Sequence, residues 1–255
     1  MKLIFINISI CIVLVVFIIT ACHKGNSMNE IDYSKDYVDS KEKILITAVM
    51  AGDTTAVKRL ASEGVNLNAV GQYENTPMTT ALKLGKKNIV RQLLGLGVKP
   101  NFRTPNGVAA AEVAVTFQKD PEYLRLLLDF GLDPNLKSEN TPLIFFALTE
   151  GNWPQYEMLL NKGADINMKN SDGSSLVLGL VMGFEYERAK DLIMKGADFK
   201  SPNVNGLNVL YELVVSQKRF CENPNSPDCR KRAELLKLMR ERGVEIPPGL
   251  PGMTE

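Results

Sequence analysis

Short helices in pairs are the recurring pattern of hydrophobic and polar positions along this chain. The clearest pair lies in Thr141–Asn167, where an apolar helix follows Thr-Pro-Leu and an amphipathic helix ends at Gly-Ala-Asp-Ile-Asn. Apolar positions in the second helices recur three and four residues apart, as on one face of a helix. Because one pair of this size cannot bury its own apolar face, the pattern predicts neighbours of the same kind along the chain.

The glycine that ends each second helix returns at a nearly fixed interval. It stands at Gly64, Gly97, Gly131, Gly163, Gly196 and Gly243, at spacings of 33, 34, 32, 33 and 47. An asparagine follows four residues later at Asn68, Asn101, Asn135 and Asn167, and Lys200 takes its place in the fifth unit. Glycine permits a left-handed helix C-cap, and we expect each asparagine to hydrogen-bond its own backbone in the turn that follows.

Two of the first helices open with Thr-Pro, at Thr76-Pro77 and Thr141-Pro142. Threonine is expected to cap the helix, and proline fits the first turn because its missing N–H has no partner there. The turn from Asn135 to Thr141 is two residues shorter than the turn from Asn68 to Thr76.

The Thr-Pro-Leu opening, the Gly-Ala-Asp-Ile-Asn ending and the interval of about 33 residues resemble the ankyrin-repeat family. The resemblance implies an all-α ankyrin-repeat solenoid of about six helix-turn-helix units over residues 41–246. It also implies that the chain binds proteins with its turn tips and first helices. The histidine that the family usually carries after Thr-Pro-Leu is missing, since Thr79 and Ile144 stand there.

Candidate partner-binding residues lie on the turn tips that this architecture predicts. Aromatic and arginine side chains dominate the energetics of interfaces, so Tyr73 and Arg103 are the strongest candidates. Trp153, at the turn between the helices of the fourth unit, either contacts a partner or packs over the gap to the fifth unit. The remaining tip candidates are Glu74, Asn106, Glu139, Asn140, Asp172 and Asn205.

The first 22 residues are typical of an export signal: Lys2, an apolar run from Leu3 to Ile19, and then Thr-Ala-Cys. We interpret residues 1–21 as a lipoprotein signal peptide and Cys22 as the lipidated residue. An ordinary cleaved signal and a transmembrane anchor remain alternatives, because the apolar run approaches the length of about 17–25 residues that spans a bilayer. His23 follows the cysteine in place of aspartate, and by resemblance to enterobacterial lipoproteins this favours the outer membrane, facing the periplasm.

Residues 22–40, from the lipidated cysteine onward, are polar and contain few apolar side chains, so we expect a flexible tether. A short capping helix around Ile31–Val38 is the alternative. At the other end, residues 247–255 form a proline- and glycine-rich tail that cannot be helix or sheet.

The sixth unit has about 14 extra residues, at 217–230. They contain Cys221 and Cys229, the two cysteines left after Cys11 in the leader and Cys22, and oxidation in the periplasm would pair them as a disulfide. Basic side chains surround this insert with a local excess of four positive charges. They would form a docking face for an acidic partner or the polar outer face that any terminal repeat needs.

Composition argues against catalysis and against nucleic acid. His23 is the single histidine, which removes Ser-His and Cys-His dyads and the usual imidazole metal sites. No phosphate-binding glycine loop is present, so we expect no cofactor, no metal, no small-molecule substrate and no enzyme activity. The chain holds 30 basic and 29 acidic residues, and this balance gives no general case for nucleic-acid binding.

A lipobox followed by ankyrin-like repeats resembles the immunity lipoproteins that accompany type VI secretion lipase effectors. The resemblance implies a periplasmic, membrane-anchored protein that binds a secreted phospholipase and inhibits it. Alternatives are a periplasmic scaffold or accessory protein that supports an envelope enzyme such as a catalase, and a lipid- or peptidoglycan-associated structural protein.

Overall fold

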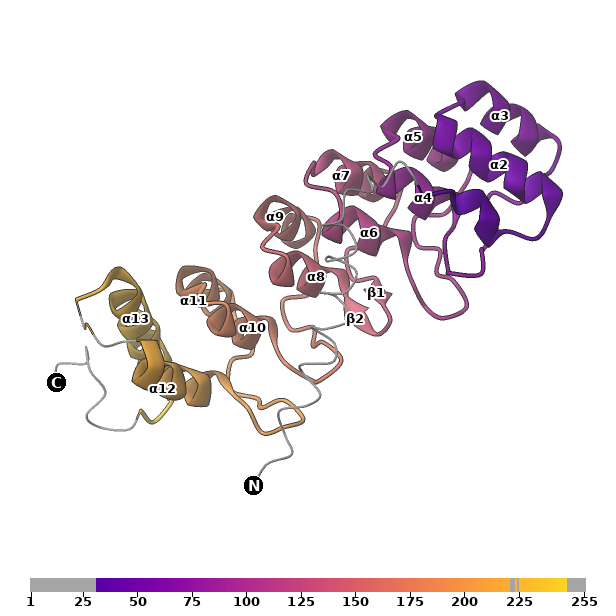
Figure 1. Ribbon diagram of the computed structural model, residues 1–255. Helices are drawn as coiled ribbons and strands as arrows, with labels where there is room; N and C mark the ends of the chain where they lie inside the picture. Colours follow the sequence, from indigo (N-terminus) through magenta and orange to yellow (C-terminus); the bar gives the residue numbers. More distant parts are fainter. Residues whose placement is uncertain (1–30, 221–222, 224, 247–255) are drawn as a thin grey trace. The chain divides into compact units, whose positions relative to one another are not determined.

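The computed structural model describes residues 31–220, 223 and 225–246. The chain forms two compact parts, the N-terminal part up to Val98 and the C-terminal part from Lys99. Both parts consist of short helices in antiparallel pairs (Figure 1).

From residue 31 onward, the N-terminal part has a single turn of 3-10 helix followed by two helix pairs. Its elements are η2 (Tyr33–Asp36), α2 (Ser40–Ala51), α3 (Thr54–Ser62), α4 (Pro77–Lys83) and α5 (Lys87–Gly95).

The C-terminal part contains four helix pairs and one short hairpin. Its elements are α6 (Ala110–Thr116), α7 (Glu122–Asp129), β1 (Lys137–Ser138), β2 (Thr141–Pro142), α8 (Leu143–Thr149), α9 (Trp153–Asn161), α10 (Leu176–Met182), α11 (Tyr186–Met194), α12 (Val209–Phe220) and α13 (Pro227–Glu241).

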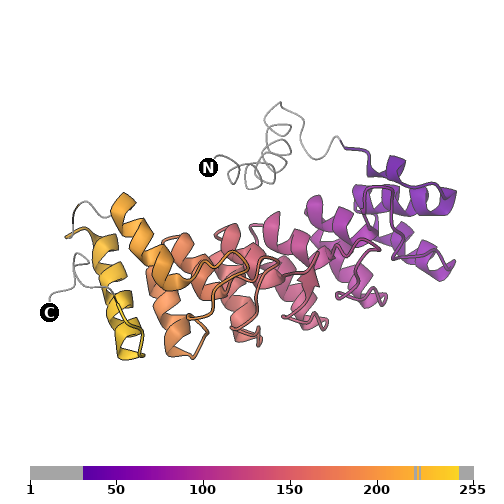
Figure 2. The same ribbon diagram turned by 90° about the horizontal axis from the view of Figure 1, so that it is seen from below.

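The first helices of the C-terminal part form one row, in which α6 contacts α8, α8 contacts α10 and α10 contacts α12. We call α6, α8, α10 and α12 the inner helices and their partners α7, α9, α11 and α13 the outer helices. The outer helices lie in a second row beside them (Figure 1), and the pairs follow one another in sequence order (Figure 2). Leucines such as Leu127, Leu143 and Leu180 are fully buried between the rows, so the core continues from pair to pair.

The predicted Thr-Pro caps are confirmed at one position and wrong at the other. The Thr76 hydroxyl accepts a hydrogen bond from the Thr79 amide at 3.1 Å, and the Thr79 hydroxyl accepts one from the Thr76 amide at 2.7 Å. This reciprocal capping box starts α4 with Pro77 in its first turn.

At Thr141 the prediction fails, because Thr141 pairs with Ser138 in the β1–β2 hairpin and α8 begins without a side-chain cap. The shorter turn is the cause. Its two central residues, Glu139 and Asn140, have φ values of +47° and +69°, as a tight two-residue hairpin requires.

The predicted tether is wrong for residues 33–37. Tyr33 and Tyr37 are buried against Ile46 and Ala69, and the Tyr37 hydroxyl donates to the carbonyl of Asn75 at 2.6 Å. These two aromatic side chains, four residues apart, supply enough apolar surface to anchor a segment whose overall composition is polar. The alternative, a short capping helix, is closer to the structure, whereas Cys22 and residues up to 30 lie outside the described residues.

The predicted insert does not form a long loop. Helices α12 and α13 have 12 and 15 residues, whereas α10 and α11 have seven and nine, so much of the extra sequence lengthens the last pair. Ser226 caps α13 by accepting a bond from the amide of Cys229 at 3.3 Å. Cys229 is buried and disulfide-bonded, and its predicted partner Cys221 lies outside the described residues, as does the tail at 247–255.

The side chains of the repeated asparagines make different hydrogen bonds from those predicted. Asn101 donates from Nδ2 to the carbonyl of Gly131 at 2.8 Å and accepts from the amide of Asp133 at 2.8 Å, so it joins its own turn to the next one. Asn135 makes the same two hydrogen bonds to the following turn. Asn167 makes one of them, because its side-chain oxygen accepts from the amide of Asp198. The local turns are closed instead by side chains two residues earlier, at Asn66, Asp133, Asp165 and Asp198.

No helix within the described ranges is both long enough and apolar enough to cross a bilayer.

Candidate partner-binding surface

The turn tips of the C-terminal part are closed, hairpin-like loops. Backbone bonds close them: the amide of Thr104 donates to Val108 at 2.9 Å, that of Asn170 to Ser174 at 3.2 Å and that of Asn203 to Leu207 at 2.8 Å. A closed loop fixes the backbone that carries its exposed side chains before any partner arrives, which lowers the entropic cost of binding.

Neighbouring tips are also bonded to one another. The amide of Glu139 donates to the carbonyl of Gly107 at 3.2 Å, and the amide of Val204 donates to the carbonyl of Asp172 at 3.0 Å. A side-chain bond of 3.0 Å from Asn203 Nδ2 to Ser174 Oγ adds to the second of these contacts. The four tips of this part therefore form two bonded pairs, at residues 103–107 with 138–139 and at residues 172–174 with 203–204.

Most of the predicted residues are exposed on these tips. Arg103, Asn106, Glu139, Asn140 and Asn205 have exposed side chains. Asp172 is half-buried, and its carboxylate accepts from the amide of Ser174 at 3.0 Å, so it mainly shapes its turn.

Two predicted residues belong to the N-terminal part, where they share one tip. Tyr73 is 75% exposed, the largest value among the aromatic residues that the structure describes. Glu74 is half-buried with a φ of +59°, so its backbone forms the turn that presents Tyr73.

Trp153 does not join the tips. It follows α8 at the end away from the hairpin, and seven helical residues put it about 10 Å from that hairpin. Its ring lies 4.0 Å from the guanidinium of Arg188 on α11 and meets the ring of Tyr156 edge-on at 5.7 Å. These contacts favour the alternative in which Trp153 packs over the gap between the fourth and fifth units.

Several exposed apolar residues were not among the predicted site residues. Phe117, Met182 and Tyr211, on or just after the inner helices, are 48%, 51% and 57% exposed. A periodicity argument assigns such side chains to the core, because it cannot tell which side of a short helix lacks a neighbour. For Phe117 and Met182 the available signal was an aromatic residue or methionine at the end of a helix, whereas Tyr211, in the first turn of α12, had no such signal.

Phe184 is a further exposed residue, in an uncommon conformation. Its φ is +62°, in the turn where three other pairs have Gly52, Gly85 and Gly151 at similar angles. The ring is 44% exposed and meets the ring of Tyr186 edge-on at 6.3 Å. A bulky residue in the left-handed region is rare, and this contact helps to hold it there.

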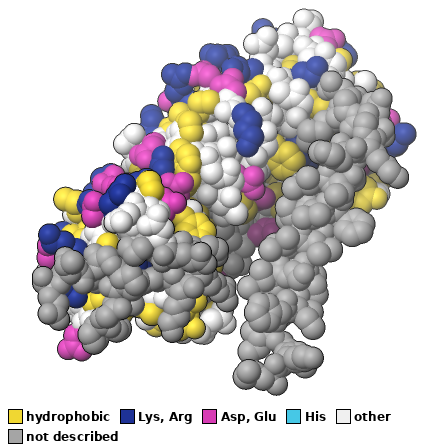
Figure 3. All heavy atoms as spheres, turned by 60° about the vertical axis from the view of Figure 1, so that its left-hand side comes forward, with side chains coloured by type: hydrophobic (Ala, Val, Ile, Leu, Met, Phe, Trp, Pro, Cys, Tyr) yellow, Lys and Arg dark blue, Asp and Glu magenta, His cyan; other side chains and the backbone are white. Residues whose placement is uncertain are grey.

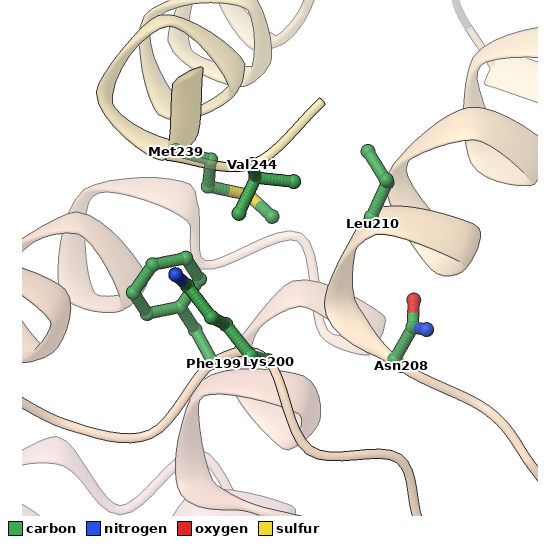
Figure 4. Close-up of a pocket in the computed structure, with 6 residues that line it drawn as sticks. All are labelled: Phe199, Lys200, Asn208, Leu210, Met239 and Val244. Atoms are coloured by element: carbon green, nitrogen blue, oxygen red, sulfur yellow. The ribbon is translucent and has the colours of Figure 1, made fainter. Parts of the chain in front are cut away.

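A small cavity of about 200 Å³ lies at the last joint of the C-terminal part (Figure 4). Its walls are mainly apolar, and one ammonium group stands beside them. The lining residues are Phe199, Lys200, Asn208, Leu210, Met239 and Val244.

Lys200, which stands where the earlier turns have asparagine, forms part of the wall of this cavity. Its Nζ donates to the carbonyl of Arg242 at 3.1 Å, near the end of α13, and lies 5.7 Å from the centre of the Phe199 ring. The partial negative charge at the C-terminal end of that helix stabilises the ammonium group. The space is smaller than the usual 300–1,000 Å³ of cofactor and ligand sites, so a single side chain fits it better than a cofactor.

Charged side chains of both signs are interspersed with hydrophobic ones on the face drawn in Figure 3. Ion pairs such as Arg188–Glu185 at 2.6 Å and Lys190–Glu234 at 2.8 Å join some of them. Within α13, Arg232 is buried, its Nε donates to the carbonyl of Leu213 at 2.9 Å, and burial lowers its pKa. One of the basic residues near the predicted insert therefore holds the last helix pair together and does not face solvent.

The described part of the chain contains no group of His, Cys, Asp and Glu side chains arranged to hold a metal ion.

Comparison with known families points to one kind of repeat. The family model for ankyrin repeats in three copies matches residues 14–104, of which 14–30 lie outside the described residues. The model for a single ankyrin repeat matches residues 138–171.

Similar proteins also carry ankyrin repeats. An ankyrin repeat-containing protein of Schizosaccharomyces pombe is 23% identical over 172 residues, which cover 64% of this chain and 81% of that protein. The SH3 and multiple ankyrin repeat domains protein 2 of Homo sapiens is 25% identical over 203 residues, which cover 78% of this chain but 11% of that protein. The human transient receptor potential cation channel subfamily A member 1 is 33% identical over 100 residues, 38% of this chain and 9% of the channel.

Among solved structures, the ankyrin repeat domain of Bcl-3, a member of the IkappaB protein family, superimposes with a TM-score of 0.63. The two chains are 23% identical, and the alignment covers 79% of this chain and 86% of that one.

Proposed function

Since this chain folds as an ankyrin-repeat solenoid, a protein-interaction fold that generally serves as a non-enzymatic binding scaffold, we propose that it is a periplasmic immunity protein. In this role it binds a phospholipase effector delivered by a type VI secretion system and covers the effector's active site. The observation that carries the proposal is the two pairs of bonded tips in the C-terminal part, of which one presents Arg103 and Glu139 and the other presents Asn205.

Inhibition of this kind requires area and shape more than chemistry. A stable interface buries about 800 Å² on each partner, and its energy is concentrated in a few aromatic and arginine side chains. The tips supply Arg103 from the C-terminal part, and the N-terminal part contributes Tyr73 on its own tip. Because the tips of the C-terminal part are closed by backbone bonds and joined in two pairs, little backbone freedom is lost when a partner binds there.

The proposed location is the periplasmic face of the outer membrane, with the chain anchored through a lipid on Cys22. The pattern of residues 1–22 supports it: one lysine, an apolar run, and small residues before the cysteine. An effector that hydrolyses phospholipids acts at the membrane, so an anchored inhibitor meets it where it works.

The test begins with the tagged full chain, recovered in mild detergent from envelopes of the producing bacterium together with its bound partner. Any captured enzyme is then assayed on phospholipid vesicles with and without added chain. We expect stoichiometric loss of lipase activity. A captured envelope enzyme whose activity is unchanged or raised would contradict the immunity role and would favour the scaffold or accessory role.

A matched pair of variants tests the surface. Arg103→Glu with Glu139→Lys changes two tips. Lys195→Glu with Glu241→Lys is the control and changes two exposed residues at the ends of outer helices. Neither pair of substitutions alters the net charge. Inhibition should weaken at least tenfold for the tip variant and stay within twofold for the control. Equal effects of the two variants would show that the tips are not the binding surface.

A further inference from the structure

The joint between the last two helix pairs departs from the hydrogen bonds that hold the earlier joints together. In those joints the side-chain oxygen of Asn101, Asn135 or Asn167 accepts from the amide two residues after the next glycine, at 2.7–2.8 Å. Lys200 stands at this place in the last joint, and lysine has no acceptor atom. Its Nζ donates to the carbonyl of Arg242 at 3.1 Å, which replaces only the bond that the asparagine nitrogen makes to a carbonyl.

The amide that loses its acceptor in the last joint is that of Glu245, two residues after Gly243. Within the part of the chain that the structure describes, this amide donates to no acceptor. The ammonium group of Lys200 carries three N–H donors, and one of them bonds to Arg242. Lys200 and Glu245 are both exposed, so donors are available at the joint where the earlier units place an asparagine oxygen.

The cavity of Figure 4 lies at the same joint. Its floor is apolar, since Phe199 and Met239 are buried there. Its rim reaches solvent, because Lys200 is exposed and Leu210 and Val244 are half-buried. An apolar cavity of about 150 Å³ takes up benzene. The volume of about 200 Å³ here therefore accommodates one phenyl ring.

From these two features we infer that the protein partner inserts a phenylalanine ring into this cavity and places a carboxylate against Lys200 and the amide of Glu245. The carboxylate oxygen then takes the position that the asparagine oxygen has in the earlier joints. Lys200 is the one charged side chain among the described residues that line the cavity, so an anion beside the ring is favoured over a cation. The inference rests on the proposed protein-binding function and adds to it the chemistry of one partner segment.

The geometry also sets the spacing of the ring and the carboxylate. Lys200 Nζ lies 5.7 Å from the centre of the Phe199 ring on the floor of the cavity. In an extended segment, side chains two residues apart lie on the same side at a separation of about 6.6 Å, whereas adjacent side chains point to opposite sides. The partner segment should therefore carry phenylalanine and an acidic residue with one residue between them.

The probe is a fluorescent peptide of sequence Gly-Ser-Phe-Ser-Asp-Ser-Gly with an amidated C-terminus, titrated with the full chain in detergent micelles. Binding is followed by anisotropy at several salt concentrations, with empty micelles as the blank. Three comparison peptides carry serine in place of phenylalanine, asparagine in place of aspartate, or the phenylalanine and aspartate side by side. We expect the parent peptide to bind at least tenfold more tightly than the first two and at least threefold more tightly than the third. Its affinity should fall as salt rises.

Variants of the chain assign the carboxylate position. Lys200→Asn restores the residue of the earlier joints, whose side-chain oxygen would occupy that position, and should weaken peptide binding at least tenfold. The midpoint of urea unfolding should be unchanged or higher, which separates a filled site from a damaged fold. Lys162→Asn is the control, because it makes the same substitution at an exposed lysine just after α9, and it should bind the peptide as the unmodified chain does.

A second variant assigns the cavity. Leu210→Phe places a ring on its wall and should weaken peptide binding at least fivefold, because the phenyl ring of the peptide loses its space. Leu96→Phe, at a partly exposed leucine after α5, is the control and should leave binding unchanged.

Equal binding of the asparagine peptide, or equal losses in the Lys200 and Lys162 variants, would overturn the inference. Leu250 follows Val244 by six residues, so tighter peptide binding after Leu250→Ser would assign the cavity to the chain's own tail and would overturn the inference too. Absence of peptide binding would have the same effect, but capture and inhibition of the native partner would still decide the immunity role separately. Conversely, peptide binding at the cavity with no inhibited lipase would remove the immunity role and leave the partner chemistry intact.

Discussion

At the scale of single residues, the hydroxyl of Tyr156 is buried without benefit to stability. The side chain is 1% exposed, burial raises the pKa of its hydroxyl, and that hydroxyl has no hydrogen-bond partner in the described part of the chain. We expect Tyr156→Phe to leave the free energy of unfolding unchanged or to raise it by about 1 kcal/mol, because an unbonded polar group is removed. Urea unfolding measures the difference.

Tyr37→Phe is the matched control, since Tyr37 is as deeply buried but its hydroxyl donates to Asn75. That variant should lose about 0.5–1.5 kcal/mol, because the carbonyl of Asn75 loses this donor and keeps the one from the amide of Gly71. A loss at Tyr156 equal to the loss at Tyr37 would mean that the Tyr156 hydroxyl is bonded after all.

Two glycines near the end of α5 should respond in opposite directions to the same substitution. Gly97 has a φ of +92°, Gly95 lies within the helix, and an added Cβ would meet nothing within 4 Å at either position. Gly97→Ala should therefore destabilise the chain by about 1–2 kcal/mol through backbone conformation alone. Gly95→Ala should stabilise it by about 0.5–1 kcal/mol, because alanine favours the helix. The midpoints of urea unfolding check both, and two changes of equal sign would contradict the conformational argument.

At the scale of elements, the asparagine bridge is the contact that ties one turn to the next. Asn135→Ala removes the bonds to Gly163 and Asp165, at 3.3 Å and 2.7 Å, and should cost about 1–3 kcal/mol. The amide of Asp165 should also exchange faster with deuterium, since it loses its acceptor. Asn161→Ala, at the exposed end of α9, is the control and should change neither quantity. Unchanged exchange at Asp165 in the Asn135 variant would mean that the turns are held by other contacts.

The helices could be predicted from the sequence, whereas several of their connections could not. A period near 33 residues and glycine at each helix end specify the pairs, because those features act within a few residues of one another. The bond from Asn101 to Gly131 joins residues 30 apart, so it depends on how pairs stack and leaves no local signal. Tyr33 and Tyr37 were assigned to a tether for the same reason: their burial depends in part on Ala69, and Tyr37 bonds Asn75, which lies 38 residues away.

At the scale of the whole molecule, the tips were the more predictable part of the candidate surface. Polar turns between amphipathic helices are exposed in almost any packing, so Arg103 and Asn205 could be placed from the sequence. The exposure of Met182 and Tyr211 could not, because both residues continue apolar runs that otherwise face the core. For Trp153 the sequence left two roles open, contact with a partner and packing over the gap between units, and the guanidinium of Arg188 against its ring favours packing.

The membrane anchor is the remaining feature that a single substitution can test. If Cys22 carries acyl chains, Cys22→Ser should move the chain from the membrane fraction to the soluble fraction and abolish incorporation of labelled palmitate. Each buried methylene contributes about 0.8 kcal/mol, so several acyl chains hold a protein almost permanently and their loss releases it. Cys11→Ser is the control, because it changes the apolar run without removing the proposed lipid site, and it should stay in the membrane. A Cys22→Ser chain that remains in the membrane fraction would instead support a transmembrane anchor formed by residues 3–19.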